Sequence, residues 1–316
     1  MTATTILPAD AEGIARAAEL IAEQHPVATP TETVYGLAAD ATSGEAVARI
    51  YEAKGRPSFN PLIVHVPGLA EAEAIADFPP LARTLAEAFW PGPLTLVLPL
   101  RKGAPIAEIV TAGLPTIALR APAHPAMRAL LEACGKPLAA PSANASGRIS
   151  PTRAEHVAAT LNGRIPLVLD AGPTRIGLES TIIAVAPERI ALLRPGPITS
   201  EEIKRVAGLP VERVSGGAIT SPGQLASHYA PRVPLRLDAV EARPGEWLIG
   251  FGKIAGDDML SARGDCTEAA ARLFEALHRA DASGRDAIAV APIPGEGLGL
   301  AINDRLKRAA APRGFA

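Results

Sequence analysis

Residues 54–66 read Lys-Gly-Arg-Pro-Ser-Phe-Asn-Pro-Leu-Ile-Val-His-Val, and they join a helix to a buried strand. Gly55 and the proline two residues later stop the preceding helix, because glycine favours the left-handed conformation after a helix and proline lacks an amide hydrogen. Residues 62–66 form a short apolar, partly β-branched run, which is typical of a buried strand. Lys54 and Arg56 are therefore held at a corner between a helix and a strand.

This corner has the character of an anion site. In open α/β sheets, ligands bind where strands end, and two cations there suit phosphate groups. The alternative is an ordinary surface turn with solvated charges, since exposed Lys and Arg are common. Two more expected strands also lead to an arginine with a proline close behind, at Arg120 and Arg194. Together with Arg56 they indicate guanidinium groups aimed at one anionic ligand, because proline pre-orders the flanking loops.

The length of 316 residues, at about 150 residues per domain, predicts two domains. Hydrophobic residues make up 48% and charged residues 20%, and the net charge of −2 argues against a surface that coats nucleic acid broadly. Cys134 and Cys266 are isolated, so neither a disulfide framework nor a zinc site is predicted. No segment reads as a signal peptide or as a membrane span, and we expect a soluble, unprocessed protein of the cytoplasm.

Helical and strand-like patterns alternate along the chain, which predicts an α/β fold. Thr42 and Glu45 are expected to form a capping box for the helix at residues 44–54. Further helices are expected at residues 10–24, 79–89, 125–134, 199–207, 267–280 and 299–309.

The segment 208–234 differs in character from its surroundings. It is rich in Gly, Pro and Ser and has no periodicity, so it is predicted to link a large domain at residues 1–207 to a small α/β domain at residues 235–316. A plain spacer would not need the pair His228 and Tyr229 in its middle. We therefore expect the linker to contact a functional site.

Polar side chains gather in three loops. Thr31 and Thr33 flank a glutamate between a proline and a glycine, which suits a small polar substrate, although local backbone bonding is the alternative. Ser142 and Asn144 would share one face of an extended loop and could reach one ligand. Ser150 is expected to start a helix, whose free amides with its hydroxyl would form a phosphate cradle.

Short motifs follow one another in a consistent order through the chain. They comprise residues 30–37, Lys54-Gly55-Arg56-Pro57 with Asn60-Pro61-Leu62 and His65, Trp90-Pro91-Gly92-Pro93 with Thr95, Leu119-Arg120, Pro141-Ser142-Ala143-Asn144 with Ser146-Gly147, Glu179-Ser180-Thr181, Leu193-Arg194-Pro195-Gly196, Ser221-Pro222-Gly223 and His228-Tyr229-Ala230-Pro231. Taken together, they resemble the L-threonylcarbamoyladenylate synthase family in its two-domain form. Residues 235–316 have the length and pattern of that family's C-terminal domain but carry no matching motif.

The resemblance implies a twisted open mixed sheet with a large positive cavity, joined by an ordered linker to a smaller, Rossmann-like C-terminal α/β domain. It implies synthesis of L-threonylcarbamoyladenylate from L-threonine, bicarbonate or CO2 and ATP, with release of pyrophosphate. Mg2+ is expected with ATP, held mainly through the phosphates and without a protein metal site. The product would pass to a tRNA threonylcarbamoyl transferase complex, and direct tRNA binding stays open.

Matched positions imply individual roles. L-threonine would be held by Thr33, His65, Arg120, Ser180 and the backbone at Ala140. ATP would be held by Arg56, Asn60, Thr116, Ser142, Asn144, Ser150, Arg194 and Tyr229. Lys54 and Arg56 would be the catalytic cations, and Lys54 and Asn144 would contact phosphate or carbamate. Since the carbamate and the mixed anhydride are labile in water, the linker with Tyr229 is expected to act as a lid.

Two other functions are compatible with parts of this pattern. A double-stranded RNA-binding or ribosome-associated module could use the same positive cavity, but the near-neutral net charge counts against it. A carbamoyltransferase related to hydrogenase maturation shares the catalytic domain, but that family adds an acylphosphatase region and cysteine-rich zinc motifs. This chain, with two isolated cysteines, shows neither.

Overall fold

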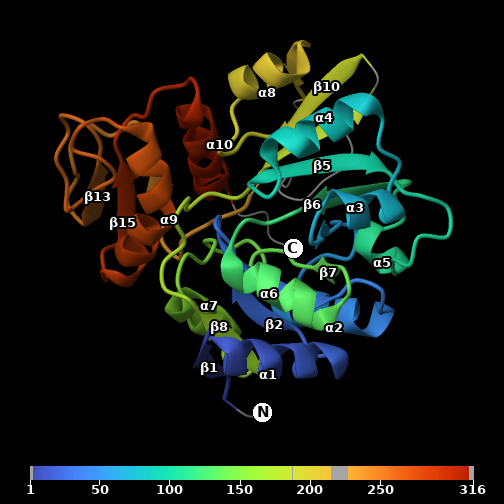
Figure 1. Ribbon diagram of the computed structural model, residues 1–316. Helices are drawn as coiled ribbons and strands as arrows, with labels where there is room; N and C mark the ends of the chain where they lie inside the picture. Colours follow the sequence, from blue (N-terminus) through green and yellow to red (C-terminus); the bar gives the residue numbers. More distant parts are fainter. Residues whose placement is uncertain (1–2, 187, 215–226, 313–316) are drawn as a thin grey trace.

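Two sheets organise the chain, a large mixed one and a small parallel one, as Figure 1 shows for the computed structural model. The structure describes residues 3–186, 188–214 and 227–312. Within these ranges, none of the helices is long and apolar enough to cross a membrane. The predicted α/β class, with a large mixed sheet and a smaller C-terminal domain, is confirmed.

The large sheet contains both parallel and antiparallel pairs of neighbouring strands. In spatial order its strands are β1 (Thr5–Pro8), β8 (Leu167–Asp170), β2 (Val27–Pro30), β3 (Tyr35–Asp40), β7 (Leu138–Ala139), β4 (Ile63–His65), β6 (Thr116–Arg120), β5 (Leu94–Pro99), β9 (Thr181–Ala186), β10 (Arg189–Arg194) and β11 (Val211–Arg213). β4 and β6 run parallel, so that His65 lies beside Arg120 at the ends of both strands. β11 belongs to the predicted linker, yet it pairs with β10 and extends the large sheet.

Six helices of the described part of the chain pack on one face of this sheet. These are α2 (Gly44–Lys54), α3 (Leu69–Ile75), α4 (Pro80–Phe89), α5 (Glu108–Thr111), α7 (Ala154–Leu161) and α8 (Ser200–Ala207). On the opposite face, α1 (Ala11–Ala22) and α6 (Pro125–Cys134) cover only the half formed by β2, β3, β7 and β8. The other half of that face carries a small apolar cluster made of strand residues alone, including Ile63, Ala118 and Ile182. A region of sheet is thus left without a helical cover.

The helix before the corner follows its sequence signals closely. α2 ends at Gly55, which has a φ of 59° and donates its amide to the carbonyls of the last turn. The capping box predicted at its start is wrong. The side chain of Ser43 caps the helix instead, while the hydroxyl of Thr42 donates to Asp40. The other predicted helices are found within a few residues of their expected bounds.

The C-terminal domain is a four-stranded parallel sheet packed against two helices. The sheet runs β12 (Leu235–Arg236), β15 (Ala287–Val290), β13 (Glu246–Gly250) and β14 (Asp258–Met259), and the helices are α9 (Cys266–Ala282) and α10 (Leu298–Ala310). Its core, around Phe274 and Ile302, also takes in Val34 and Leu178 of the large domain and Tyr229 of the linker. The core of the C-terminal domain therefore extends across the domain boundary, and α10 lies between the small sheet and the large domain (Figure 1).

Candidate active site

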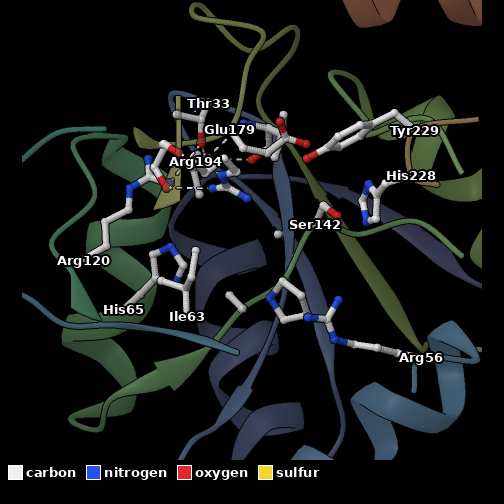
Figure 2. A pocket seen from close by; sticks show the side chains of 16 residues that line it. Thr33, Arg56, Ile63, His65, Arg120, Ser142, Glu179, Arg194, His228 and Tyr229 are labelled. Carbon is white, nitrogen blue, oxygen red and sulfur yellow. Dashed lines mark hydrogen bonds between the residues drawn. The ribbon is translucent and has the colours of Figure 1, made fainter. Parts of the chain in front are cut away.

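A cavity opens on the part of the large sheet that lacks a helical cover. It holds about 560 Å3 of empty space, its opening to solvent included. Sixteen residues line it: Thr31, Thr33, Val34, Gly36, Arg56, Ile63, His65, Arg120, Ala140, Pro141, Ser142, Glu179, Ser180, Arg194, His228 and Tyr229. Figure 2 shows His65 and Arg120 at the left of the cavity and Arg56, His228 and Tyr229 at the right. The end of β4 forms part of the floor, since Ile63 and His65 both point into the space.

The residues predicted to hold threonine converge in this cavity. Thr33, His65, Arg120, Ala140 and Ser180 all line it, although they come from separate segments of the chain. Arg120 is fixed there by three hydrogen bonds, to the carboxylate of Glu32, the hydroxyl of Thr33 and the carbonyl of Gly92. A guanidinium group has five N–H donors, so two of them stay free for a carboxylate.

Glu32 was not among the predicted site residues, but it sets the position of Arg120. Both side chains are buried, and the second carboxylate oxygen of Glu32 accepts the amide of Ala123. Burial alone would raise the pKa of Glu32, but the charge and hydrogen bonds of Arg120 hold it below its ordinary value. The carboxylate is therefore charged and keeps the guanidinium in one orientation. The position of Glu32 between two threonines, in a loop bounded by proline and glycine, was the sequence signal for this role.

His65 is buried and neutral. Burial, together with the positive charge of Arg120, lowers its pKa to about 3. Its Nδ1 atom is buried and makes no hydrogen bond within the described part of the chain. An unpaired buried polar atom costs about 1–3 kcal/mol, so a ligand that pairs with this nitrogen gains affinity.

Ser180 and Arg194 both line the cavity and are joined by hydrogen bonds. The Ser180 hydroxyl lies 2.7 Å from that of Thr95 and accepts a hydrogen bond of 3.0 Å from Arg194. A second nitrogen of Arg194 donates to the Ser180 carbonyl. Arg194 forms no ion pair with a carboxylate among the described residues, so its charge is available to an anion.

Arg56 lies across the cavity from Arg120 (Figure 2). It donates to the carbonyls of Asn60 and Pro61, which fixes it against the loop that leads into β4. Burial lowers its pKa to about 10, so it is protonated at neutral pH. Like Arg194, it has no carboxylate partner within the described ranges. Two guanidinium groups that form no ion pair among the described residues thus face one cavity, as the Arg-Pro corners predicted.

Lys54 does not line the cavity, in contrast to the prediction for the corner. Its amine is buried and donates to the carbonyls of Ser142 and Asn144. Burial, together with the charge of Arg56, holds the pKa of Lys54 well below its ordinary value. In this structure, Lys54 ties the helix-to-strand corner to the loop at residues 142–144.

Comparison with known proteins decides the family. Residues 19–196 match the family model described as "Telomere recombination", which covers Sua5, YciO and YrdC, and residues 198–311 match the model "Threonylcarbamoyl-AMP synthase, C-terminal domain". The threonylcarbamoyl-AMP synthase of Bacillus subtilis is 44% identical over 95% of this chain and 93% of its own length. That of Pyrococcus abyssi is 41% identical over 94% of each.

The chain belongs to the threonylcarbamoyl-AMP synthase family. The fold agrees, since the crystal structure of P. abyssi Sua5 complexed with L-threonine superposes with a TM-score of 0.89 and 39% identity, over 97% of this chain and 98% of that one. The family prediction is confirmed, and the synthase is favoured over the RNA-binding alternative. Some shorter relatives, such as a putative threonylcarbamoyl-AMP synthase of Mycobacterium tuberculosis, match over 93% of their own length but only 65% of this chain.

The residues predicted to hold ATP in this synthase are placed unevenly. Arg56, Ser142, Arg194 and Tyr229 line the cavity, whereas Asn60, Thr116, Asn144 and Ser150 do not. The side-chain oxygen and nitrogen of Asn60 are both buried and unpaired among the described residues, and so is the side-chain oxygen of Asn144. Thr116 is half-buried at the start of β6, four residues before Arg120. It therefore lies at the other end of that strand.

Ser150 does not begin a helix, so the predicted cradle of free amides is wrong. α7 begins at Ala154, and the buried Ser150 hydroxyl donates to the carboxylate of Glu179. Glu179 lines the cavity and was not given a role from sequence. Its place in the Glu-Ser-Thr motif, directly before a buried strand, was the signal for it.

The linker reaches the site, as its His-Tyr pair predicted. His228 and Tyr229 line the cavity, with ring centroids 4.1 Å apart, and Tyr229 packs on Phe274 of the C-terminal domain. Burial lowers the pKa of His228 to about 3, so it is neutral. The motif at residues 221–223 lies outside the described residues.

Proposed function

We propose that this chain synthesises L-threonylcarbamoyladenylate from L-threonine, bicarbonate or CO2 and ATP, with release of pyrophosphate. The observation that carries the proposal is the meeting of polar side chains around Arg120 and His65 with the guanidinium groups of Arg56 and Arg194 in one cavity. Neither of these two groups forms an ion pair among the described residues. Pyrophosphate release that depends on ATP, threonine and bicarbonate together would test it. Release without threonine would contradict it.

For threonine we propose a pose against β4 and β6. Its carboxylate would accept from the two free donors of Arg120, and Thr33 would complete the contact. The neutral ring of His65 would pair with the threonine hydroxyl or amine through its unpaired nitrogen. Ser180 and the backbone at Ala140 would close the pocket, so that the amine faces the side where ATP is expected.

For ATP we propose the opposite side of the cavity. Arg56 and Arg194 would contact the phosphates, with Ser142 and Tyr229 beside them. The side-chain amide of Asn60 and the side-chain oxygen of Asn144, which are unpaired among the described residues, would meet the nucleotide after a shift of their loops. Ser150 would contact it through the same hydroxyl that now donates to Glu179. Thr116 and Lys54, which do not line the cavity, would act on ATP only after a larger change of the loops around them.

The proposed reaction needs positioning rather than a protein nucleophile. The threonine amine adds to CO2 and loses a proton, which gives a carbamate. A carbamate oxygen then attacks the α-phosphorus of ATP, the bond to the β-phosphate oxygen breaks, and pyrophosphate leaves with the electron pair. Arg56 and Arg194 would neutralise the charge that grows on pyrophosphate.

Mg2+ is expected to enter with ATP. No group of three His, Cys, Asp or Glu side chains in the described part of the chain could hold a metal. Glu179, which lines the cavity, and Glu32, which orients Arg120, each form an ion pair with an arginine. Phosphate oxygens would therefore supply most of the ligands, and the ion would neutralise phosphate charge when bound.

Removal of Mg2+ is expected to stop turnover and spare threonine binding. Excess EDTA should reduce pyrophosphate release to background, and Mg2+ added above the chelator should restore it. Threonine affinity, measured by calorimetry, should not change, because the proposed threonine contacts contain no metal. Full activity in EDTA would show that the phosphates are neutralised by the protein alone.

Threoninol is expected to fail as a substrate. It lacks the carboxylate that Arg120 is proposed to hold, so one charge-assisted bidentate contact is lost and the amine is no longer positioned. Pyrophosphate release with threoninol should lie near background under conditions where L-threonine is turned over. Turnover of threoninol at a rate similar to that of threonine would exclude this role of Arg120.

We also propose that the chain acts in the cytoplasm and that its product is consumed by a tRNA threonylcarbamoyl transferase complex. A mixed anhydride of this kind is labile in water, which favours direct use by a nearby acceptor enzyme. Addition of such a complex and tRNA to the synthase reaction should yield threonylcarbamoylated tRNA. Modification that proceeds equally well without this chain would contradict the proposal.

A further inference from the structure

Arg305 is a fully buried arginine that the C-terminal domain places against the large domain. It lies in α10, and none of its side-chain surface is exposed. Its Nε donates to the carboxylate of Glu179 at 2.9 Å, Nη2 donates to the Glu179 carbonyl at 3.3 Å, and Nη1 donates to the carbonyl of Pro195 at 2.7 Å. These three contacts all cross from one domain to the other.

Through Glu179, the contact of Arg305 extends to the cavity. Glu179 lines the cavity and accepts the hydroxyl of Ser150 on its other carboxylate oxygen. Burial alone would raise the pKa of Glu179, but the charges of Arg305 and Arg194 hold it below its ordinary value, so it is an anion. Without a cationic partner, the negative charge of Glu179 would repel the triphosphate of ATP. Arg305, which does not line the cavity, forms the ion pair that neutralises this charge.

Two further cavity residues depend on the same arginine. The guanidinium carbon of Arg305 lies 5.6 Å from the ring centroid of Tyr229, within the range of a cation–π interaction. Tyr229 has a φ of 64°, an unfavourable backbone conformation for a residue with a side chain, so its place requires support from its neighbours. The bond to Pro195 holds the residue that directly follows Arg194.

We propose that Arg305 is a positioning residue of the active site, which the C-terminal domain contributes to set Glu179, Ser150 and Tyr229 for ATP. The inference rests on the synthase function proposed above and adds a role for the second domain. The shorter relatives are too short to contain a counterpart of that domain, because the match already covers 93% of their length. The contact of Arg305 with Glu179 is therefore specific to the two-domain form. Arg305 acts through its neighbours and does not itself line the cavity.

The test compares Arg305→Met and Arg305→Lys in the full chain with Lys307→Met as the control. Lys307 lies two residues along the same helix and is exposed, so its loss should change nothing. Arg305→Met should raise the KM for ATP by roughly tenfold or more and change the KM for threonine less, because the side chain of Ser180, the threonine residue next to Glu179, is held by Thr95 and Arg194 rather than by Arg305. Arg305→Lys should fall between the two, since it keeps the charge but not the fork of donors.

A double-mutant cycle separates this role from a purely structural one. In a Glu179→Gln background the carboxylate charge at the cavity is gone, while the ion pair of Arg305 with Asp304 stays. Arg305→Met should therefore raise the KM for ATP much less in that background than it does in the wild type. An equal rise in both backgrounds, an equal rise of the threonine KM, or no rise at all would overturn the inference. If Arg305→Met alone does not fold, the KM for ATP is compared between the double variant, Arg305→Lys and the wild type. Absence of threonine-dependent activity in the wild type would instead reject the proposed function.

Discussion

Arg56→Ala is expected to lower threonine-dependent pyrophosphate release by on the order of 100-fold. Arg56 is buried at the cavity, is protonated at neutral pH and has no carboxylate partner in the described part of the chain. Its charge is therefore free to stabilise the pyrophosphate that forms in the transition state. Steady-state release of pyrophosphate at saturating threonine and ATP measures the effect, and kcat should fall more than the KM for ATP rises.

The matched control is Arg16→Ala. Arg16 lies on α1, is paired with Glu19 and is half-exposed, so the same change of residue type should leave turnover intact. Arg56→Lys should recover part of the rate, because it restores the charge but not the hydrogen bonds to Asn60 and Pro61. A wild-type rate for Arg56→Ala would remove the helix-to-strand corner from the active site.

Deletion of residues 208–316 is expected to lower turnover by at least about 100-fold, although most of the large sheet stays in the chain. The deletion takes away Tyr229 from the cavity wall and Arg305 from behind Glu179. A displacement of about 1 Å at a wall residue is enough for a loss of this size. Pyrophosphate release by the purified fragment, beside its circular dichroism spectrum, measures the effect.

The deletion also exposes apolar side chains that the domains share, such as Val34 and Leu178. A second variant therefore protects the test from a fragment that aggregates. Tyr229→Ala in the full chain keeps the C-terminal domain and removes only the wall contributed by the linker. A folded fragment with an undiminished rate, or full activity of Tyr229→Ala, would contradict the role assigned to the linker as a cover.

Local sequence signals were enough for the elements that carry the site. α2, Gly55 and β4 follow from helix-stop chemistry and from a short apolar run, since both depend on neighbouring residues. The resemblance then selected five threonine positions, and all of them line one cavity. Short strands such as β1 and β3 were missed, because their residues are fixed by pairing with distant strands rather than by a local pattern.

At the helix-to-strand corner, the local sequence did not predict which cation lines the cavity. Both of its cations were predicted to face the ligand, and only Arg56 lines the cavity. Lys54 turns instead to two carbonyl groups almost ninety residues away in sequence. A cation at a helix end has no local preference between a ligand and a distant carbonyl group, so only packing could decide.

Arg305 is the strongest example of a charged residue whose partner could not be predicted from the local sequence. In sequence it belongs to the basic end of a helix, beside Lys307 and Arg308, where solvated charges are common. Its spacing from Ile302 and Ala309 places it on the apolar face of α10, which was the available signal.

The sequence by itself determined the family and the α/β class, and it selected five residues that line one cavity, because these depend on motifs and on local periodicity. Tertiary structure alone decided which charges are paired. Arg120 meets Glu32 and Arg305 meets Glu179, while Arg56 and Arg194 stay without a carboxylate among the described residues. The physical reason is that a buried charge must find its partner in space, and the partner comes from whichever segment the fold brings within hydrogen-bond distance.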